Sequence, residues 1–143
     1  MGSRPIEAVP LLLDTHYWIW SQFGTGEQVP QPLRLAMQEA AAASSLMLSA
    51  ISVWEVALLD AKGRIELFSP IEEWVGNALA TPGLSLVPLT PEIAIDSNRL
   101  PGSYHGDPAD RIIIATARRE GARLLTRDHD MRKVARKLGI EVL

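Results

Sequence analysis

Four acidic residues occupy comparable places in the chain and could together hold a metal ion. Asp14 and Asp128 each follow an apolar run typical of a buried strand, and Glu55 and Asp110 each lie in the first turn of an expected helix. In a parallel sheet, the ends of the strands and the starts of the following helices meet at one edge. Oxygen ligands favour hard cations, so these positions predict a Mg²⁺ or Mn²⁺ site.

The chemistry of such a site follows from its charge. Several carboxylates within a few ångströms repel one another, so either some remain protonated or a cation neutralises them. A divalent ion held by Asp14, Glu55 and Asp110 would polarise a phosphate oxygen and lower the pKa of a bound water. Asp128 would orient that water or hold a second ion. The predicted reaction is therefore hydrolysis of a phosphodiester bond.

Two of these acids also have a purely structural interpretation. Ser52 and Glu55 fit the capping box S-x-x-E, in which Glu55 would bond back to the backbone of Ser52. Asp107 precedes Pro108, and we interpret it as the N-cap of the following helix. Asp110, three residues later, could complete that cap. The sequence alone leaves both roles open for Glu55 and Asp110.

The other two acids differ in how easily they can be structural. Asp14 directly follows Leu11–Leu13, close to a core, where an unpaired carboxylate is costly. Asp128 and its neighbour Asp130 could be ordinary loop residues. The metal prediction therefore depends on four acids sharing one edge of a sheet rather than on any one of them.

Short apolar runs alternate with longer helical patterns, as in a parallel sheet with crossover helices. The predicted fold is of the α/β class, a three-layer α/β/α arrangement with a central, mostly parallel sheet of about five strands. Strands are expected at Val9–Leu13, Leu46–Leu48, Leu84–Val87, Arg123–Thr126 and Ile140–Leu143, with a short extended piece at Arg64–Phe68. Helices are expected from about Thr15, over about Pro32–Ala43 and Ser52–Ala61, from a capping Ser69 to about Ala80, from Thr90, from Asp107 to about Glu120, and over His129–Leu138.

The length of 143 residues and the apolar fraction of 47% indicate one globular domain with its own core. We assign this domain to residues 9–143 and expect residues 1–8 to be an N-terminal tail or an expression remnant. No apolar run approaches the about 20 residues that a membrane-spanning helix needs. The sequence has no cysteine, which excludes disulfides and thiolate zinc sites and is compatible with the cytoplasmic location that we expect.

The net charge of −3 conceals an uneven distribution. Residues 1–98 contain four Lys/Arg and eleven Asp/Glu, whereas residues 99–143 contain ten Lys/Arg and six Asp/Glu. This basic C-terminal third could meet phosphates, or it could consist of solvated helix faces. Arg99, Arg111 and Arg127 lie nearest to the acids in sequence, and Arg111 could instead pair with a carboxylate of the site.

Four segments together resemble PIN-domain proteins, and among these most closely the toxin nucleases of VapBC toxin–antitoxin pairs. The resemblance extends over about Leu11–Leu143, and the order of the segments makes it specific. The segments are Leu12-Leu13-Asp14-Thr15-His16, Ser49-Ala50-Ile51-Ser52-Val53-Trp54-Glu55-Val56, His105-Gly106-Asp107-Pro108-Ala109-Asp110-Arg111-Ile112-Ile113-Ile114-Ala115 and Leu124-Leu125-Thr126-Arg127-Asp128.

The resemblance implies a PIN-like fold, with a parallel sheet between helices, and Mg²⁺- or Mn²⁺-dependent cleavage of RNA that leaves a 3′-hydroxyl and a 5′-phosphate. Thr15 and Thr126 match hydroxyl residues that support the family's site by hydrogen bonds. Position by position, the family's metal-binding acids correspond to Asp14, Glu55, Asp110 and Asp128.

The resemblance also implies two protein partners, a second copy in a homodimer and a small antitoxin that covers the active site. Trp18 and Trp20 cannot share a helix face, so one of them is expected to be exposed, where it would suit a partner or a base. For His16 and His105 we favour structural hydrogen bonding over metal binding. The candidates for substrate contact are His16, Arg111 and Arg127.

Three other functions are compatible with parts of this pattern. A PIN nuclease of RNA processing would use the same chemistry without an antitoxin. A non-catalytic binding module would use the acids only as helix caps and surface charges. A phosphatase with an aspartate nucleophile would need an Asp-x-Asp motif after the first strand and a lysine placed to bind phosphate, and we find neither in the sequence.

Overall fold

The structure, a computed structural model, describes residues 9–23, 28–102 and 104–143. Residues 1–8, the expected tail, lie outside the described residues. The strands are β1 Leu11–Leu13, β2 Leu46–Ser49, β3 Leu84–Val87 and β4 Arg123–Leu125. The helices are α1 Thr15–Phe23, α2 Gln31–Ala42, α3 Ala50–Ala61, α4 Ile71–Leu79, α5 Pro91–Asp96, α6 Pro108–Glu120 and α7 His129–Lys137.

The four strands form one parallel sheet in the order β3-β2-β1-β4. Leu12 of the central strand β1 pairs with Met47 of β2 on one side and Leu124 of β4 on the other. A continuous apolar run is typical of a strand that is buried on both faces, and β1 is such a strand. Because β1 is central, its C-terminal end lies in the middle of the sheet edge where the acids were predicted to meet.

One predicted strand is wrong. Ile140–Leu143 contributes only an isolated parallel bridge, in which Val142 lies opposite Leu124, rather than a fifth strand. Residues 64–68, predicted as a short extended piece, join no strand of the sheet, and the last of them, Phe68, has a φ of 63°, outside the extended range. The α/β class with a parallel central sheet is confirmed, with four strands in the described residues.

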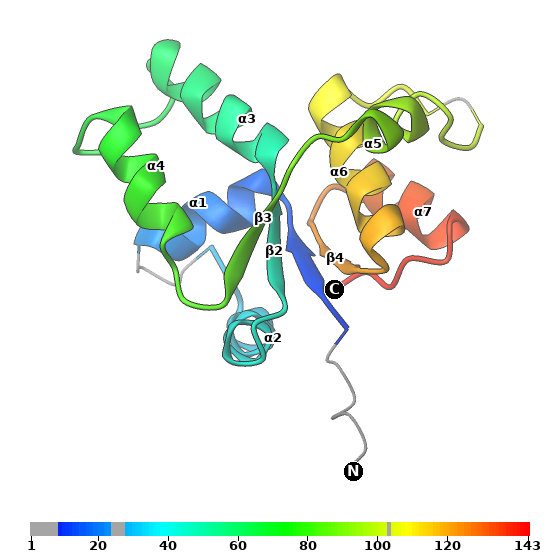
Figure 1. Ribbon diagram of the computed structural model, residues 1–143, viewed down its shortest axis with the longest axis horizontal. Helices are drawn as coiled ribbons and strands as arrows, with labels where there is room; N and C mark the ends of the chain where they lie inside the picture. Colours follow the sequence, from blue (N-terminus) through cyan, green and yellow to red (C-terminus); the bar gives the residue numbers. More distant parts are fainter. Residues whose placement is uncertain (1–8, 24–27, 103) are drawn as a thin grey trace.

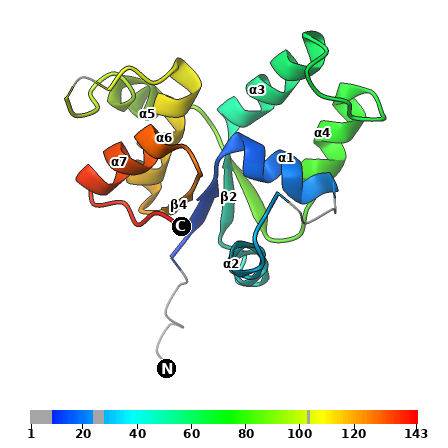
Figure 2. The ribbon, with the colours of Figure 1, turned by 180° about the vertical axis from the view of Figure 1, so that it is seen from behind.

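Helices cover both faces of the sheet. Figure 1 shows α1, α3 and α4, with α2 below them, on one side of the strands, and α5, α6 and α7 on the other. The view from behind in Figure 2 shows the same division. The result is the predicted three-layer arrangement. Within the described ranges, no helix combines the length and the apolar character that crossing a membrane requires.

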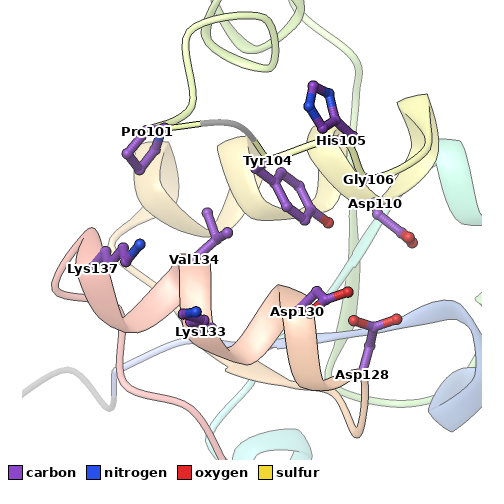
Figure 3. Close-up of a pocket in the computed structure, with 11 residues that line it drawn as sticks. Pro101, Tyr104, His105, Gly106, Asp110, Asp128, Asp130, Lys133, Val134 and Lys137 are labelled. Carbon is purple, nitrogen blue, oxygen red and sulfur yellow. The ribbon is translucent and has the colours of Figure 1, made fainter.

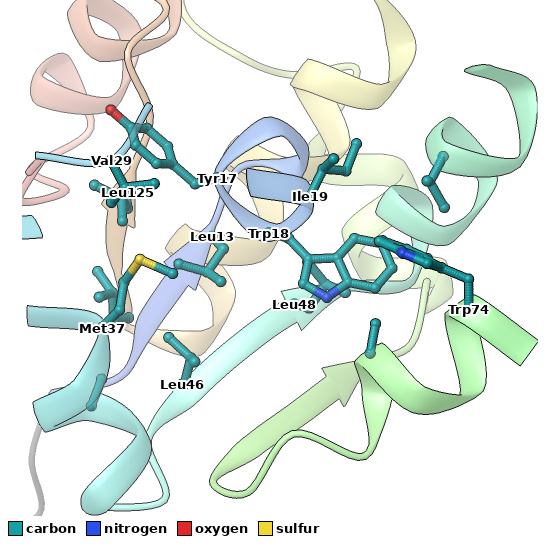
Figure 4. Packing of buried hydrophobic residues seen from close by; sticks show 14 of the residues in the cluster. Leu13, Tyr17, Trp18, Ile19, Val29, Met37, Leu46, Leu48, Trp74 and Leu125 are labelled. Carbon is teal, nitrogen blue, oxygen red and sulfur yellow. The ribbon is translucent and has the colours of Figure 1, made fainter. Parts of the chain in front are cut away.

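The pleat of β1 divides its side chains between two cores. Leu13 and Trp18 belong to the core beneath α1–α4, where the ring centroids of Trp18 and Trp74 are 5.2 Å apart in an edge-on arrangement (Figure 4). Leu12 packs on the opposite face with Ile113 of α6. Trp18 is fully buried, so of the two neighbouring tryptophans only Trp20 remains available to the surface.

The helix starts agree only in part with the predicted caps. Thr90 and Asp107 cap α5 and α6 through side-chain hydrogen bonds, as predicted. Ser69 does not cap α4, which begins after Pro70 without any side-chain cap. Helix α3 begins earlier than predicted, with Ser49 as its N-cap, because the end of β2 leads directly into the helix.

Gly83 joins the end of α4 to β3 where the chain passes very close to α2. Its φ is 81°, and a Cβ atom there would lie 1.9 Å from the carbonyl oxygen of Ala41. We expect Gly83→Ala to lower the free energy of unfolding by about 2 kcal/mol, since both the backbone conformation and the contact become strained. Urea unfolding monitored by circular dichroism measures this effect.

Gly76 supplies the matched control, because it lies on an exposed part of α4 and a Cβ atom added to it would have no neighbour within 4 Å. Gly76→Ala should stabilise the protein by about 0.5–1 kcal/mol, since alanine favours the helix. Equal effects of the two substitutions would contradict the close approach at Gly83.

Candidate metal centre

The four predicted acids line a single pocket at the carboxyl edge of the sheet. Its volume is about 410 Å³. Asp14 follows β1, Glu55 lies on α3, Asp110 lies in the first turn of α6, and Asp128 precedes α7. The pocket is lined by these four acids together with His16, Trp20, Asp107 and Arg127.

Asp14 is the most buried of the acids, with 7% of its surface exposed. Its Oδ1 accepts a hydrogen bond from the backbone N–H of Thr15 at 2.7 Å, and its Oδ2 accepts one from the Thr126 hydroxyl at 2.7 Å. Burial raises the pKa of Asp14, and these two hydrogen bonds oppose that effect. The carboxylate is therefore held in one orientation by β1, α1 and the end of β4.

Glu55 is held by the same turn of α1. The hydroxyl of Thr15 donates to Glu55 Oε1, and it also lies 2.7 Å from the hydroxyl of Ser52. Because the Thr15 proton is directed at Glu55, Ser52 donates to Thr15. The capping-box interpretation of Ser52 and Glu55 is therefore wrong: Ser52 lies inside α3 and supports Thr15, and the sequence analysis missed this role.

Asp107 is a further acid of the site that sequence reasoning assigned only to capping. It does cap α6, since its Oδ1 accepts a hydrogen bond from the Asp110 N–H at 2.8 Å. Ligand oxygens of Glu55, Asp107 and Asp110 also lie within 4.8 Å of one another. A carboxylate has two oxygens, so capping and metal binding are compatible. The signal was the cap itself, which fixes Asp107 beside Asp110.

Asp110 shows the strongest electrostatic perturbation of the four predicted acids. Burial, followed by the neighbouring charges of Asp107, Asp14 and Glu55, raises its pKa to about 7. No hydrogen bond from the described residues reaches its carboxylate. A partly buried carboxylate surrounded by others and without a donor is stabilised by a cation, and all-oxygen ligands suit a hard divalent ion. The donor set therefore fits such an ion.

Asp128 combines two roles in the same way as Asp107. Its Oδ1 accepts from the Met131 N–H at 2.9 Å and caps α7, while its own N–H donates to the Thr126 hydroxyl at 3.1 Å. Asp128 and Asp14 both line the pocket, but neither is part of the close group formed by Glu55, Asp107 and Asp110. Thr126 thus links Asp14 and Asp128 across the edge of the sheet.

Comparison with known proteins places this arrangement in a family. The family model for the PIN domain matches residues 11–137. The chain belongs to the PIN-domain family. The matched range includes every acid of the pocket, so the acidic centre lies within the PIN domain.

Known proteins resemble this PIN domain in sequence or in fold. The ribonuclease VapC22 of Mycobacterium tuberculosis (strain ATCC 25618 / H37Rv) is 39% identical over 125 residues, which are 85% of this chain and 89% of the relative. Among solved structures, VapBC2 from Rickettsia felis, bound to a promoter DNA fragment, has a TM-score of 0.66 at 14% identity and covers 93% of this chain and 96% of that chain. DNA-bound VapBC from Salmonella typhimurium has a TM-score of 0.63 at 20% identity, with 95% and 98% covered. The two structural likenesses concern the fold.

A cationic and aromatic rim borders the acidic pocket of this PIN domain. The guanidinium carbon of Arg127 lies 5.3 Å from the centroid of a Trp20 ring, and the His16 ring lies 5.7 Å from Trp20. Tyr17 packs edge-on against the same indole at 5.4 Å. Trp20 is thus partly buried among α1 side chains and also contacts Arg127, which lines the pocket.

Two other sequence candidates do not line the acidic pocket. Arg111 lines neither the acidic pocket nor its neighbour, and its Nε is buried without a hydrogen-bond partner among the described residues. In the described ranges the ion pair that forms is Arg119–Asp96, so Arg111 does not pair with a carboxylate of the site. His105 lines the neighbouring pocket rather than the acidic one.

Proposed function

We propose that this chain is a metal-dependent endoribonuclease, the toxin of a type II toxin–antitoxin pair, with residues 9–143 acting as one nuclease domain. The observation that carries the proposal is the gathering of Asp14, Glu55 and Asp110 from three distant parts of the chain in one pocket, where Asp110 has a pKa of about 7. The similarity to the ribonuclease VapC22 supports RNA as the substrate.

The protein's own contribution is the placement of charge. Asp14, Glu55 and Asp110, with Asp107 and Asp128 beside them, would hold Mg²⁺ or Mn²⁺. Such an ion supplies polarisation of a phosphodiester oxygen and a lowered pKa for a bound water. Thr15 and Thr126 keep the carboxylates aimed at the pocket through the hydrogen bonds that they donate.

Arg127 is the residue we propose for binding substrate phosphate. It lines the acidic pocket, and its guanidinium lies over the indole of Trp20. A guanidinium can contact two phosphate oxygens at once. His16, exposed on the same rim, is our second candidate for substrate contact, and Arg111 would reach only RNA that extends beyond this rim.

The test is cleavage of defined single-stranded RNAs by the purified protein with Mg²⁺, with Mn²⁺ or with EDTA, followed by mapping of the cut sites. We expect internal cuts only in the presence of a divalent ion, with a 3′-hydroxyl and a 5′-phosphate at each cut. Cleavage that is equally fast in EDTA would overturn the metal-dependent mechanism.

The stacking of Arg127 on Trp20 gives a smaller, separate prediction. A cation–π contact at an exposed site contributes about 0.5–1 kcal/mol, so Trp20→Leu should raise KM for RNA about two- to fivefold and leave kcat nearly unchanged. Trp54→Leu is the matched control, because Trp54 is 56% exposed on α3 and does not line the pocket. Initial rates over a range of RNA concentrations separate KM from kcat, and equal KM values for both variants would contradict the role of Trp20.

The proposed partners are a small antitoxin, as in the VapBC structures that share this fold, and a second copy of the chain. A short reading frame next to the gene should encode a protein that co-purifies with the chain and suppresses RNA cleavage. Light scattering of the purified chain should give the mass of a dimer. An active nuclease that no neighbouring gene product inhibits would favour the RNA-processing alternative.

A further inference from the structure

A second pocket, of about 450 Å³, opens beside the acidic pocket and shares Asp110 and Asp128 with it. Its other walls come from the loop before α6 and from α7 (Figure 3). The chemistry proposed above uses none of these other walls. Because the two pockets have two carboxylates in common, a polymeric ligand bound at the acidic centre would continue into this space.

The second pocket is divided by charge. Figure 3 shows Lys133 and Lys137 on one side and the carboxylates of Asp110, Asp128 and Asp130 on the other. The two lysines are four residues apart on α7, so they share one face of that helix. Neither forms an ion pair with a described residue, which leaves both ammonium groups able to bind an anion.

Tyr104 lies between the two charged sides and provides an aromatic surface (Figure 3). Gly106 leaves the room that this side chain needs, since a Cβ atom at Gly106 would lie 2.1 Å from the Tyr104 hydroxyl oxygen. Val134 adds apolar surface to the same wall. The pocket therefore offers a cationic end, an aromatic middle and an acidic end that fits a divalent ion.

We propose that this pocket holds the nucleotide next to the cleaved bond of a single-stranded RNA, with Lys133 and Lys137 at its phosphate and the Tyr104 ring against its base. This inference rests on the proposed function and specifies how the substrate lies. The volume is in the range of pockets for small ligands, so one unstacked nucleotide fits. A base pair held in a duplex cannot enter such a concave space, whereas single strands expose bases for stacking on aromatic rings.

The first experiment measures binding of a fluorescein-labelled single-stranded RNA by anisotropy at several salt concentrations, with Asp110→Asn in every variant to prevent cleavage. Lys133→Ala/Lys137→Ala should raise Kd about tenfold. It should also reduce the slope of log Kd against log salt by about 0.7, because the two lysines neutralise one phosphate and each neutralised phosphate contributes about 0.7 for single strands. Lys62→Ala/Arg136→Ala removes the same charge from exposed positions that line neither pocket, and should change neither quantity.

The second experiment tests the aromatic contact in the same assay. Tyr104→Phe should keep Kd within about twofold, whereas Tyr104→Leu should raise it about fivefold or more, since the ring rather than the hydroxyl stacks on the base. Thermal melts confirm that each variant is folded. Equal Kd values for Tyr104→Phe and Tyr104→Leu would overturn the stacking contact.

The outcomes separate this inference from the nuclease proposal. If the Lys133/Lys137 variant and its control bind RNA equally well while the wild type cleaves RNA with Mn²⁺, the nucleotide pocket is overturned and the nuclease stands. If the lysine variant binds RNA more weakly and with a smaller slope of log Kd against log salt, while the wild type cleaves no RNA, the nucleotide pocket stands and the nuclease proposal fails. Competition by double-stranded RNA as strong as by single-stranded RNA would overturn the pocket.

Discussion

Asp14→Asn is expected to lower the rate of Mn²⁺-dependent RNA cleavage by at least about a hundredfold. Substituting a residue that only supports a metal ligand already lowers activity by up to about that factor, and Asp14 is proposed as a ligand itself. The substitution removes the negative charge while keeping the shape of the side chain. Its amide nitrogen can face Thr126, whose hydroxyl can turn to accept a hydrogen bond, so the fold should persist. Single-turnover cleavage of a labelled RNA measures the rate.

Asp60→Asn is the matched control for this loss. Asp60 lies on α3, is partly buried like Glu55 and Asp110, and does not line the pocket. The Asp60→Asn variant should therefore cleave RNA at the wild-type rate. Wild-type activity in Asp14→Asn would remove Asp14 from the proposed metal site, and an equal loss in Asp60→Asn would show that the effect is not specific to the site.

Asp110→Asn is expected to abolish cleavage as well, yet to stabilise the protein when no metal is present. Burial and four neighbouring carboxylates disfavour its charge, and replacing it with a neutral side chain removes that repulsion. Because Asp110 is only partly buried, solvent screening reduces the gain to about 1 kcal/mol, or roughly 3 °C in Tm. The wild type should gain stability on adding Mn²⁺, and this gain should be lost in the variant.

The sign of the pH dependence follows from the pKa of Asp110, which is about 7 in the folded chain against a reference value of 3.8. The folded chain binds this proton more tightly than the unfolded chain, so the metal-free wild type loses stability as the pH rises from about 4 to about 7. The advantage of Asp110→Asn should be full above about pH 7 and should vanish near pH 4. Thermal melts in EDTA across this range measure it. A variant less stable than the wild type at pH 8 would refute the repulsion.

Local sequence predicted the elements that build the site. Short apolar runs such as Leu11–Leu13 are typical of strands that are buried on both faces, and capping by Thr90 and Asp107 is fixed by residues three positions apart. The placement of Asp14 and Glu55 at one edge followed from the parallel sheet alone. Their gathering in one pocket agrees with that expectation.

The sequence did not decide which of two nearby residues caps a helix when both have a suitable side chain. Ser49 and Ser52 are both hydroxyl residues near the start of α3, and either could cap it. In the structure Ser49 caps the helix, whereas Ser52 is bonded to the hydroxyl of Thr15, 37 residues away from it in sequence, which also donates to Glu55. The sequence also did not predict that Asp107 is an acid of the pocket. Its capping of α6 involves neighbouring residues, whereas its place beside Glu55 depends on the tertiary structure.

The sequence by itself determined the succession of strands and helices along the chain, the acids at the strand ends and the family to which the chain belongs. Each of these depends on short runs of consecutive residues. Only the tertiary structure decided which side chains meet. The bond from Thr126 to Asp14 spans 112 residues, and the pocket that places Lys133 and Lys137 beside Asp110 joins α7 to the loop before α6. Such contacts depend on the strand order β3-β2-β1-β4 and on helix packing, which no single segment encodes.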